Sequence, residues 1–159
     1  MILEQVRRAA IWGLKLSSYI AFLAPLMTRI VLGQAFFFAG RGKWANFERT
    51  VSFFSDSGIP FPSANAAFVS SLEVVGGICL ILGLLTRLMA AGLASTMVVA
   101  LLTADNDKLM NAMGSDLTDV TSLVFLLFML WLALYGPGPF CLDHLLSKWL
   151  NIPSEEKKS

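Results

Sequence analysis

Residues 64–86 read ANAAFVSSLEVVGGICLILGLLT, and this stretch decides the fold class. It is 23 residues long, and a helix needs roughly 20 to cross the hydrocarbon core of a bilayer. Its one charged residue is Glu73. A carboxylate near the middle of such a helix costs about 2.5–3.5 kcal/mol on insertion scales, so it needs a partner or a function. The stretch therefore predicts a membrane span that carries a polar group inside the protein.

The composition of the whole chain supports the same class. Hydrophobic residues make up 56% of the 159 residues and charged residues 14%, whereas soluble domains contain about 25% charged residues. The net charge is +1 and no basic run with interleaved aromatics occurs, so we expect no nucleic-acid partner. Two cysteines and one histidine are too few for a typical metal site, and we expect neither a metal nor a covalently bound cofactor.

Four apolar segments predict an all-α, integral membrane four-helix bundle that forms one membrane domain over residues 1–159. The expected spans cover about residues 20–40, 64–86, 88–104 and 117–135. Because very few residues separate the second span from the third, these two must form an antiparallel hairpin.

Two further helices are expected at the membrane surface. Residues 1–18 are predicted to form an amphipathic helix whose basic residues face anionic headgroups, with a solvated tail as the alternative. Between the first two spans, Trp44, Phe47, Val51 and Phe54 recur at helical spacing, which predicts an interfacial helix that could also cover the mouth of the bundle. The segments expected inside carry seven basic residues and those outside four, which favours cytoplasmic N- and C-termini.

One pair of buried charges is the central prediction. Arg29 and Gly33 share a face of the first span, with Gln34 beside them, and Glu73 shares a face of the second span with Gly76. Small residues let neighbouring membrane helices approach closely, so we expect Arg29 to form an intramembrane ion pair with Glu73. The pair could be a structural clamp, or it could be the polar end of a ligand site.

At this point the order of motifs resembles the DoxX family from about Arg29 to Asp143. The motifs that carry the resemblance, besides Arg29 and Asp143 themselves, are Gly40-Arg41-Gly42-Lys43, Gly58-Ile59-Pro60, Glu73-Val74-Val75-Gly76-Gly77, Gly83-Leu84-Leu85-Thr86-Arg87 and Gly136-Pro137-Gly138. One departure is that many relatives have a histidine near the exit of the first span, where this chain has Phe38, Ala39 and Gly40.

The resemblance implies a multi-pass protein of the bacterial inner membrane, related to the small DoxD subunit of thiosulfate:quinone oxidoreductase. It implies no established catalytic residues, so the catalytic residues stay unknown. The function we expect is a subunit of a membrane redox complex that contributes a quinone or other lipid-borne small-molecule site between helices.

In that hypothesis Gln34, Lys43 and Arg87 are candidate ligand-lining residues, and Glu73 exchanges protons. The chain has no evident redox centre, so we expect other membrane or membrane-associated subunits to carry the electrons, and we do not expect a complete oxidoreductase. The alternative is a non-catalytic accessory or scaffold subunit of a larger membrane assembly. A transporter is a weaker hypothesis, because four helices leave little room for alternating access.

Overall fold

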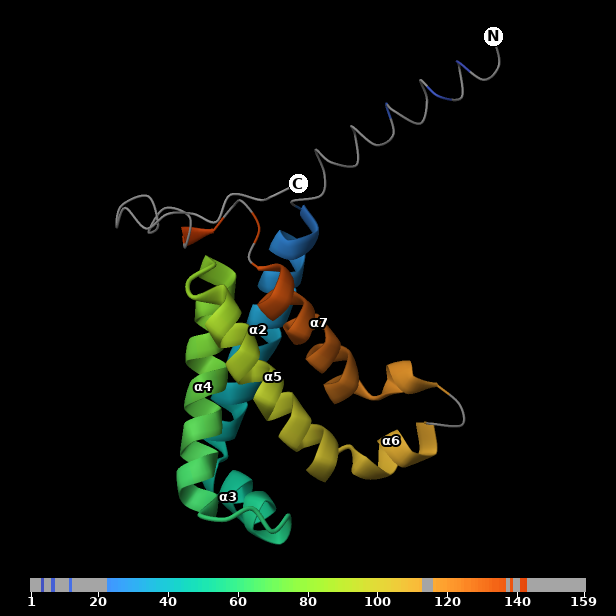
Figure 1. Cartoon of the computed structure of the whole chain (residues 1–159). Helices are drawn as coiled ribbons and strands as arrows, with labels where there is room; N and C mark the ends of the chain where they lie inside the picture. The colour runs from blue at the N-terminus through green and yellow to red at the C-terminus, as the bar shows by residue number, and fades with distance from the viewer. Residues whose placement is uncertain are drawn as a thin grey trace.

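The structure is a computed structural model that describes residues 23–112 and 116–136, together with the single positions Glu4, Arg7, Trp12, Gly138, Cys141 and Leu142. The amphipathic helix predicted over residues 1–18 therefore lies outside the described residues apart from three positions. Within the described ranges every regular element is a helix (Figure 1).

Three of the helices are long and apolar enough to cross a membrane, and a shorter apolar helix follows them. The long helices are α2 (Leu23–Ala45), α4 (Pro62–Leu82) and α5 (Thr86–Thr103), and the shorter one is α7 (Thr121–Tyr135). The connections contain α3 (Phe47–Asp56), α6 (Asn106–Ala112) and the 3₁₀ turn η1 (Leu117–Asp119).

The first predicted span differs most from the observed helix. We expected it to end near Gly40, but α2 continues to Ala45 and so contains Lys43 in its last turn. A glycine inside a helix costs only about 1 kcal/mol relative to alanine, and Gly40 is buried against α4. The other three predicted spans lie within four residues of the observed bounds at each end.

The turn between α4 and α5 explains the hairpin. Gly83 has a φ of +70°, a left-handed conformation that glycine adopts without a steric penalty. The N–H of Gly83 donates to the carbonyl of Leu80 at 3.2 Å, and that of Leu84 donates to the carbonyl of Cys79 at 2.8 Å. This pair of bonds is the Schellman motif that ends many helices. It allows α5 to run back alongside α4, as the short connection predicted (Figure 1).

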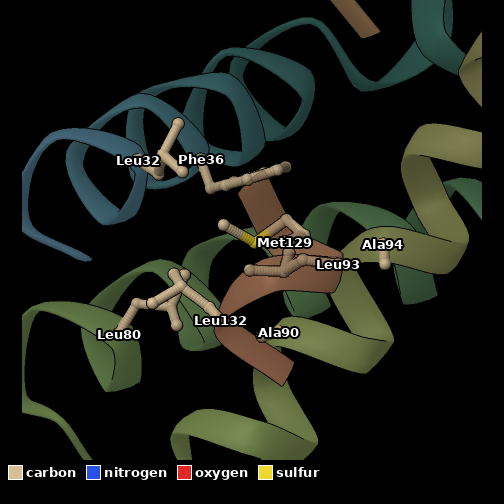
Figure 2. Close-up of a cluster of buried hydrophobic side chains, with 8 residues drawn as sticks. All are labelled: Leu32, Phe36, Leu80, Ala90, Leu93, Ala94, Met129 and Leu132. Atoms are coloured by element: carbon tan, nitrogen blue, oxygen red, sulfur yellow. The ribbon is translucent and has the colours of Figure 1, made fainter. Parts of the chain in front are cut away.

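Buried side chains from four helices meet in one cluster (Figure 2). Helix α2 packs chiefly against α4, and α5 packs chiefly against α7. The cluster consists of Leu32, Phe36, Leu80, Ala90, Leu93, Ala94, Met129 and Leu132. It ties the two helix pairs together.

Helix α3 lies across the end of the molecule where α2 finishes and α4 begins (Figure 1). Its Phe54 is buried, whereas Glu48, Arg49 and Asp56 are exposed. The structure thus contains a short helix in this connection, but Trp44, which was part of the predicted pattern, lies in the last turn of α2.

Candidate functional site

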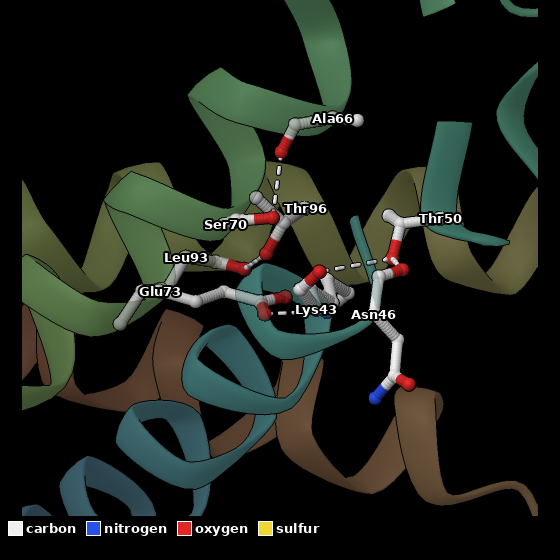
Figure 3. Close-up of polar contacts among 8 residues, drawn as sticks. All are labelled: Lys43, Asn46, Thr50, Ala66, Ser70, Glu73, Leu93 and Thr96. Atoms are coloured by element: carbon white, nitrogen blue, oxygen red, sulfur yellow. Dashed lines mark hydrogen bonds and ion pairs between the residues drawn. The ribbon is translucent and has the colours of Figure 1, made fainter. Parts of the chain in front are cut away.

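An ion pair joins the end of α2 to the middle of α4. The Lys43 ammonium donates to the Glu73 carboxylate, and the two side chains point toward each other (Figure 3). The Glu73 side chain is only 2% exposed and that of Lys43 is 31% exposed. Lys43 also lies in the last turn of its helix, where the helix dipole favours a positive charge.

Close packing of backbones brings these two residues together. A Cβ atom added to Gly40 would lie 2.7 Å from the Ser70 carbonyl oxygen and 2.8 Å from the Glu73 Cβ atom. Further along the same interface, a Cβ on Gly33 would lie 2.7 Å from the carbonyl oxygen of Gly77. Because these positions have no side chains, α2 and α4 touch along their length, as small residues allow in membrane helices.

The ion pair forms part of the wall of a cavity of about 320 Å³. Ligand pockets in proteins are typically about 300–1,000 Å³, so the volume suits a small molecule. Side chains from α2, α3, α4, α5 and α7 contribute to the lining, which is mostly apolar. Its larger apolar residues are Phe36, Phe53, Phe54, Ile59, Met97 and Phe125, and the rings of Phe36 and Phe125 lie 5.7 Å apart between centroids.

Two threonines in the lining donate their hydroxyl hydrogen bonds to backbone carbonyls of their own helix. The hydroxyl of Thr96 donates to the carbonyl of Leu93 at 2.8 Å, and that of Thr103 donates to the carbonyl of Val99 at 2.8 Å. These bonds satisfy the donors locally, in the pattern common to Ser and Thr within helices. Among the described residues that line the cavity, the charged ones are Lys43 and Glu73.

A second polar cluster reaches the cavity from the start of α7. Ser122 lines the cavity, and its hydroxyl donates to the buried carboxylate of Asp105, which also accepts from Lys108 at 2.9 Å. The bond from Ser122, followed by that from Lys108, lowers the pKa of Asp105, because hydrogen bonds to a carboxylate favour its charged form. Asp105 is therefore ionised at neutral pH, next to the cavity wall.

The predicted ion pair between Arg29 and Glu73 is wrong. The partner of Glu73 is Lys43, and the Arg29 guanidinium lies near the C-terminal end of α4, where its Nη1 atom is 2.7 Å from the position a Cβ on Gly83 would take. Arg29 is 1% exposed, so it is buried as expected, but among different neighbours that include Cys141. Along α2, 14 residues separate Arg29 from Lys43, a rise of about 21 Å.

Of the three residues predicted to line a ligand site, only Lys43 lines the cavity. Gln34 is exposed on the outward side of α2. Arg87 is exposed at the start of α5 and its Nε atom lies 3.2 Å from the position of a Cβ on Gly136. The polar cluster of Asp105 and Ser122 was not predicted, although an acidic residue directly after an apolar segment was a usable signal.

These features define a class: an all-helical protein with membrane-length helices and a small, mostly apolar cavity whose wall contains a buried ion pair. The chain matches the DoxX family over residues 24–106, more than half of its length, and it belongs to that family. It is a membrane protein, and the resemblance noted from its motifs is confirmed.

One curated relative is similar over part of the chain. It is a protein of Bacillus subtilis (strain 168) described as "Putative oxidoreductase CatD", and it is 32% identical over 81 residues. The match covers 51% of this chain and 59% of the relative, so it extends over less than two thirds of that protein. No solved structure matches the chain.

Proposed function

We propose that the cavity binds a small lipid-borne molecule, with a quinone headgroup as the first candidate, and that the chain is a subunit of a membrane redox complex. The observation that carries this proposal is the Lys43–Glu73 pair in the wall of a mostly apolar cavity of about 320 Å³. Such pockets, apolar with a few convergent polar groups, are the usual form of small-molecule sites.

The residues of the cavity fit a quinone headgroup. A bound quinone supplies two-electron, two-proton redox chemistry. The apolar lining and the Phe36–Phe125 ring pair suit an aromatic ring, the Lys43 ammonium can donate a hydrogen bond to a carbonyl oxygen, and the Glu73 carboxylate can exchange a proton. On the α7 side, the Ser122 hydroxyl oxygen can accept a hydrogen bond while its proton is held by Asp105.

The similarity to the relative described as "Putative oxidoreductase CatD" supports a redox role. The two cysteines and single histidine of this chain offer little for a resident redox centre. We therefore place the electron-carrying groups on other membrane or membrane-associated subunits, so that this chain contributes the binding site and not the complete enzyme.

We also propose an arrangement in the bacterial inner membrane. Helices α2, α4, α5 and α7 form a four-helix, multi-pass bundle, and α3 lies in the interface, with Trp44 in the last turn of α2 at headgroup level. The excess of basic residues on the segments before α2, between α4 and α5, and after α7 supports cytoplasmic N- and C-termini.

The alternative is a non-catalytic accessory or scaffold subunit. The observation that favours it is that Lys43 and Glu73 bind each other directly, so that the pair links α2 to α4 without a ligand. In this case the ion pair fixes the register of the two helices, which is a well-supported use of buried polar groups.

Photoaffinity labelling of the full-length chain in lipid nanodiscs distinguishes the two. A short-tailed azidoquinone should label peptides that contain Phe36 or Phe125, and excess decylubiquinone should compete. The double variant Lys43→Gln/Glu73→Gln should lose at least about tenfold of the labelling at unchanged abundance, while the exposed control Arg87→Gln should keep it. Absence of specific labelling in the wild type, with lost abundance of the double variant, would support the scaffold function instead.

A further inference from the structure

The outward face of α2 carries an amide at the middle of the membrane. Gln34 is the twelfth of the 23 residues of α2, and its side chain is exposed, about 100° around the helix from Gly33, which faces α4. It makes no hydrogen bond with the rest of the described chain. In the hydrocarbon core no water is available to a polar group, so an amide without a partner at this depth is costly.

The residues around Gln34 on this face are apolar and also exposed. Met27, Val31 and Phe38 are 46%, 62% and 55% exposed, and they lie one or two helical turns from Gln34 on the same side. The nearest charge along this face is Arg41, which lies seven residues further at the end of α2, where it can reach phosphate groups and water. The face thus has a single polar site within an apolar surface.

We infer that two copies of this chain associate through this face of α2, with Gln34 of each copy hydrogen-bonded to Gln34 of the other. A carboxamide contains both donors and an acceptor, so it is complementary to a second copy of itself. A two-fold axis places the same residue on both sides of an interface. Glutamine side chains that hydrogen-bond between membrane helices are a recognised cause of helix association.

This interface is independent of the cavity. Gly33 and Gly40 face α4 from a different side of α2, and the cavity opens among α2, α3, α4, α5 and α7. Self-association therefore neither requires nor blocks the proposed ligand site, and the two proposals can fail separately.

The first test is energy transfer between two fluorescently tagged populations of the full-length chain, reconstituted in liposomes over a range of protein-to-lipid ratios. Wild type should show concentration-dependent transfer. Gln34→Leu should require about tenfold more protein per lipid for the same transfer, whereas Gln34→Asn, which keeps the amide, should associate more strongly than the leucine variant. Because leucine suits a lipid-facing position, we expect unchanged abundance and thermal stability of the Gln34→Leu monomer.

A positional test uses a photo-crosslinking residue placed at Val31, with Ile78 as the matched control. Ile78 is 41% exposed on α4 and lies at a similar depth, because Gly33 packs against Gly77. Crosslinked dimers should form from Val31 and not from Ile78. Monomers at all densities, equal transfer for wild type and Gln34→Leu, or equal crosslinking at both positions would each overturn the inference.

Discussion

Replacing Lys43 by Met leaves the Glu73 carboxylate inside the helix bundle without its ion-pair partner. Removing one partner of a buried pair typically costs about 3–5 kcal/mol, because the other charge stays buried. Lys43 is 31% exposed, so water can partly replace its charge, and we expect a loss near the lower limit, about 3 kcal/mol.

Removing the acidic partner alone should lower the free energy of unfolding less than removing Lys43 alone. Glu73→Met leaves an ammonium on a long, flexible side chain that can extend to water, so we expect a loss of about 1 kcal/mol. The double variant Lys43→Met/Glu73→Met removes both charges and should also lose about 1 kcal/mol, because well-packed apolar residues often replace a buried pair without loss. The sum of the two single losses in the free energy of unfolding then exceeds the loss of the double variant by about 3 kcal/mol, which is the coupling between Lys43 and Glu73.

The assay is reversible unfolding of the full-length protein in mixed micelles by titration with SDS, followed by far-UV circular dichroism. A control cycle combines Arg29→Met with Glu73→Met. Since Arg29 lies at Gly83 and not at Glu73, these two changes should add to within about 0.5 kcal/mol. Additive costs for Lys43 and Glu73, or a coupling in the control cycle as large as theirs, would refute the assignment of partners.

Three further predictions concern packing and pH. Gly33→Ala should lower the free energy of unfolding by about 1–3 kcal/mol in the same assay, because its Cβ would lie 2.7 Å from a carbonyl oxygen of α4; Gly42→Ala, with no atom within 4 Å, should raise it by up to about 1 kcal/mol. Hydrogen bonds from Ser122 and Lys108 lower the pKa of Asp105 below its ordinary value of 3.8, so its stabilising contribution is fully present above that pH and is lost as the pH falls through the folded-state pKa. Unfolding measured from pH 5 down to pH 2 should therefore depend less steeply on acid in Asp105→Asn than in wild type, and an unchanged acid dependence would contradict this. Ser122→Ala should reduce the same acid dependence partially, because the bond from Lys108 remains.

Much of the fold could be predicted from the sequence because membrane spans depend on local composition. The 23-residue stretch around Glu73 identified α4 to within four residues, and the short link after it identified the hairpin with α5. The recurrence of Phe47, Val51 and Phe54 identified the helix between the first two spans, whereas Trp44, counted in the same pattern, belongs to α2. Each of these features depends on residues that are close in sequence.

The partner of Glu73 could not be predicted because it depends on the register between two helices. If the first span had ended at Gly40, an antiparallel neighbour would have placed Glu73 level with residues near Arg29. The helix instead continues to Ala45, and Gly40 packs directly against Glu73. This moves the contact about three helical turns away from Arg29, to the part of α2 that contains Gly40 and Lys43.

The outward position of Gln34 could not be predicted for a similar reason, because it depends on how α2 is rotated against α4. We expected Gln34 beside the face of Arg29 and Gly33, but consecutive helical residues such as Gly33 and Gln34 differ in direction by about 100°. Only the contact of Gly33 with Gly77 shows which of the two directions faces the protein.

Helix α7 has only 15 residues and therefore rises about 22 Å, whereas a bilayer's hydrocarbon layer is about 30 Å thick. As the fourth span of the proposed bundle, it is too short to match an undistorted membrane. Local thinning of the bilayer beside the helix accommodates this mismatch. A mismatch of this kind also directs proteins toward membranes with thinner bilayers. Headgroups would then come closer to Ser122 on this side of the molecule than elsewhere, and a hydrophobic molecule that diffuses in the membrane would reach the bundle there through the thinned bilayer.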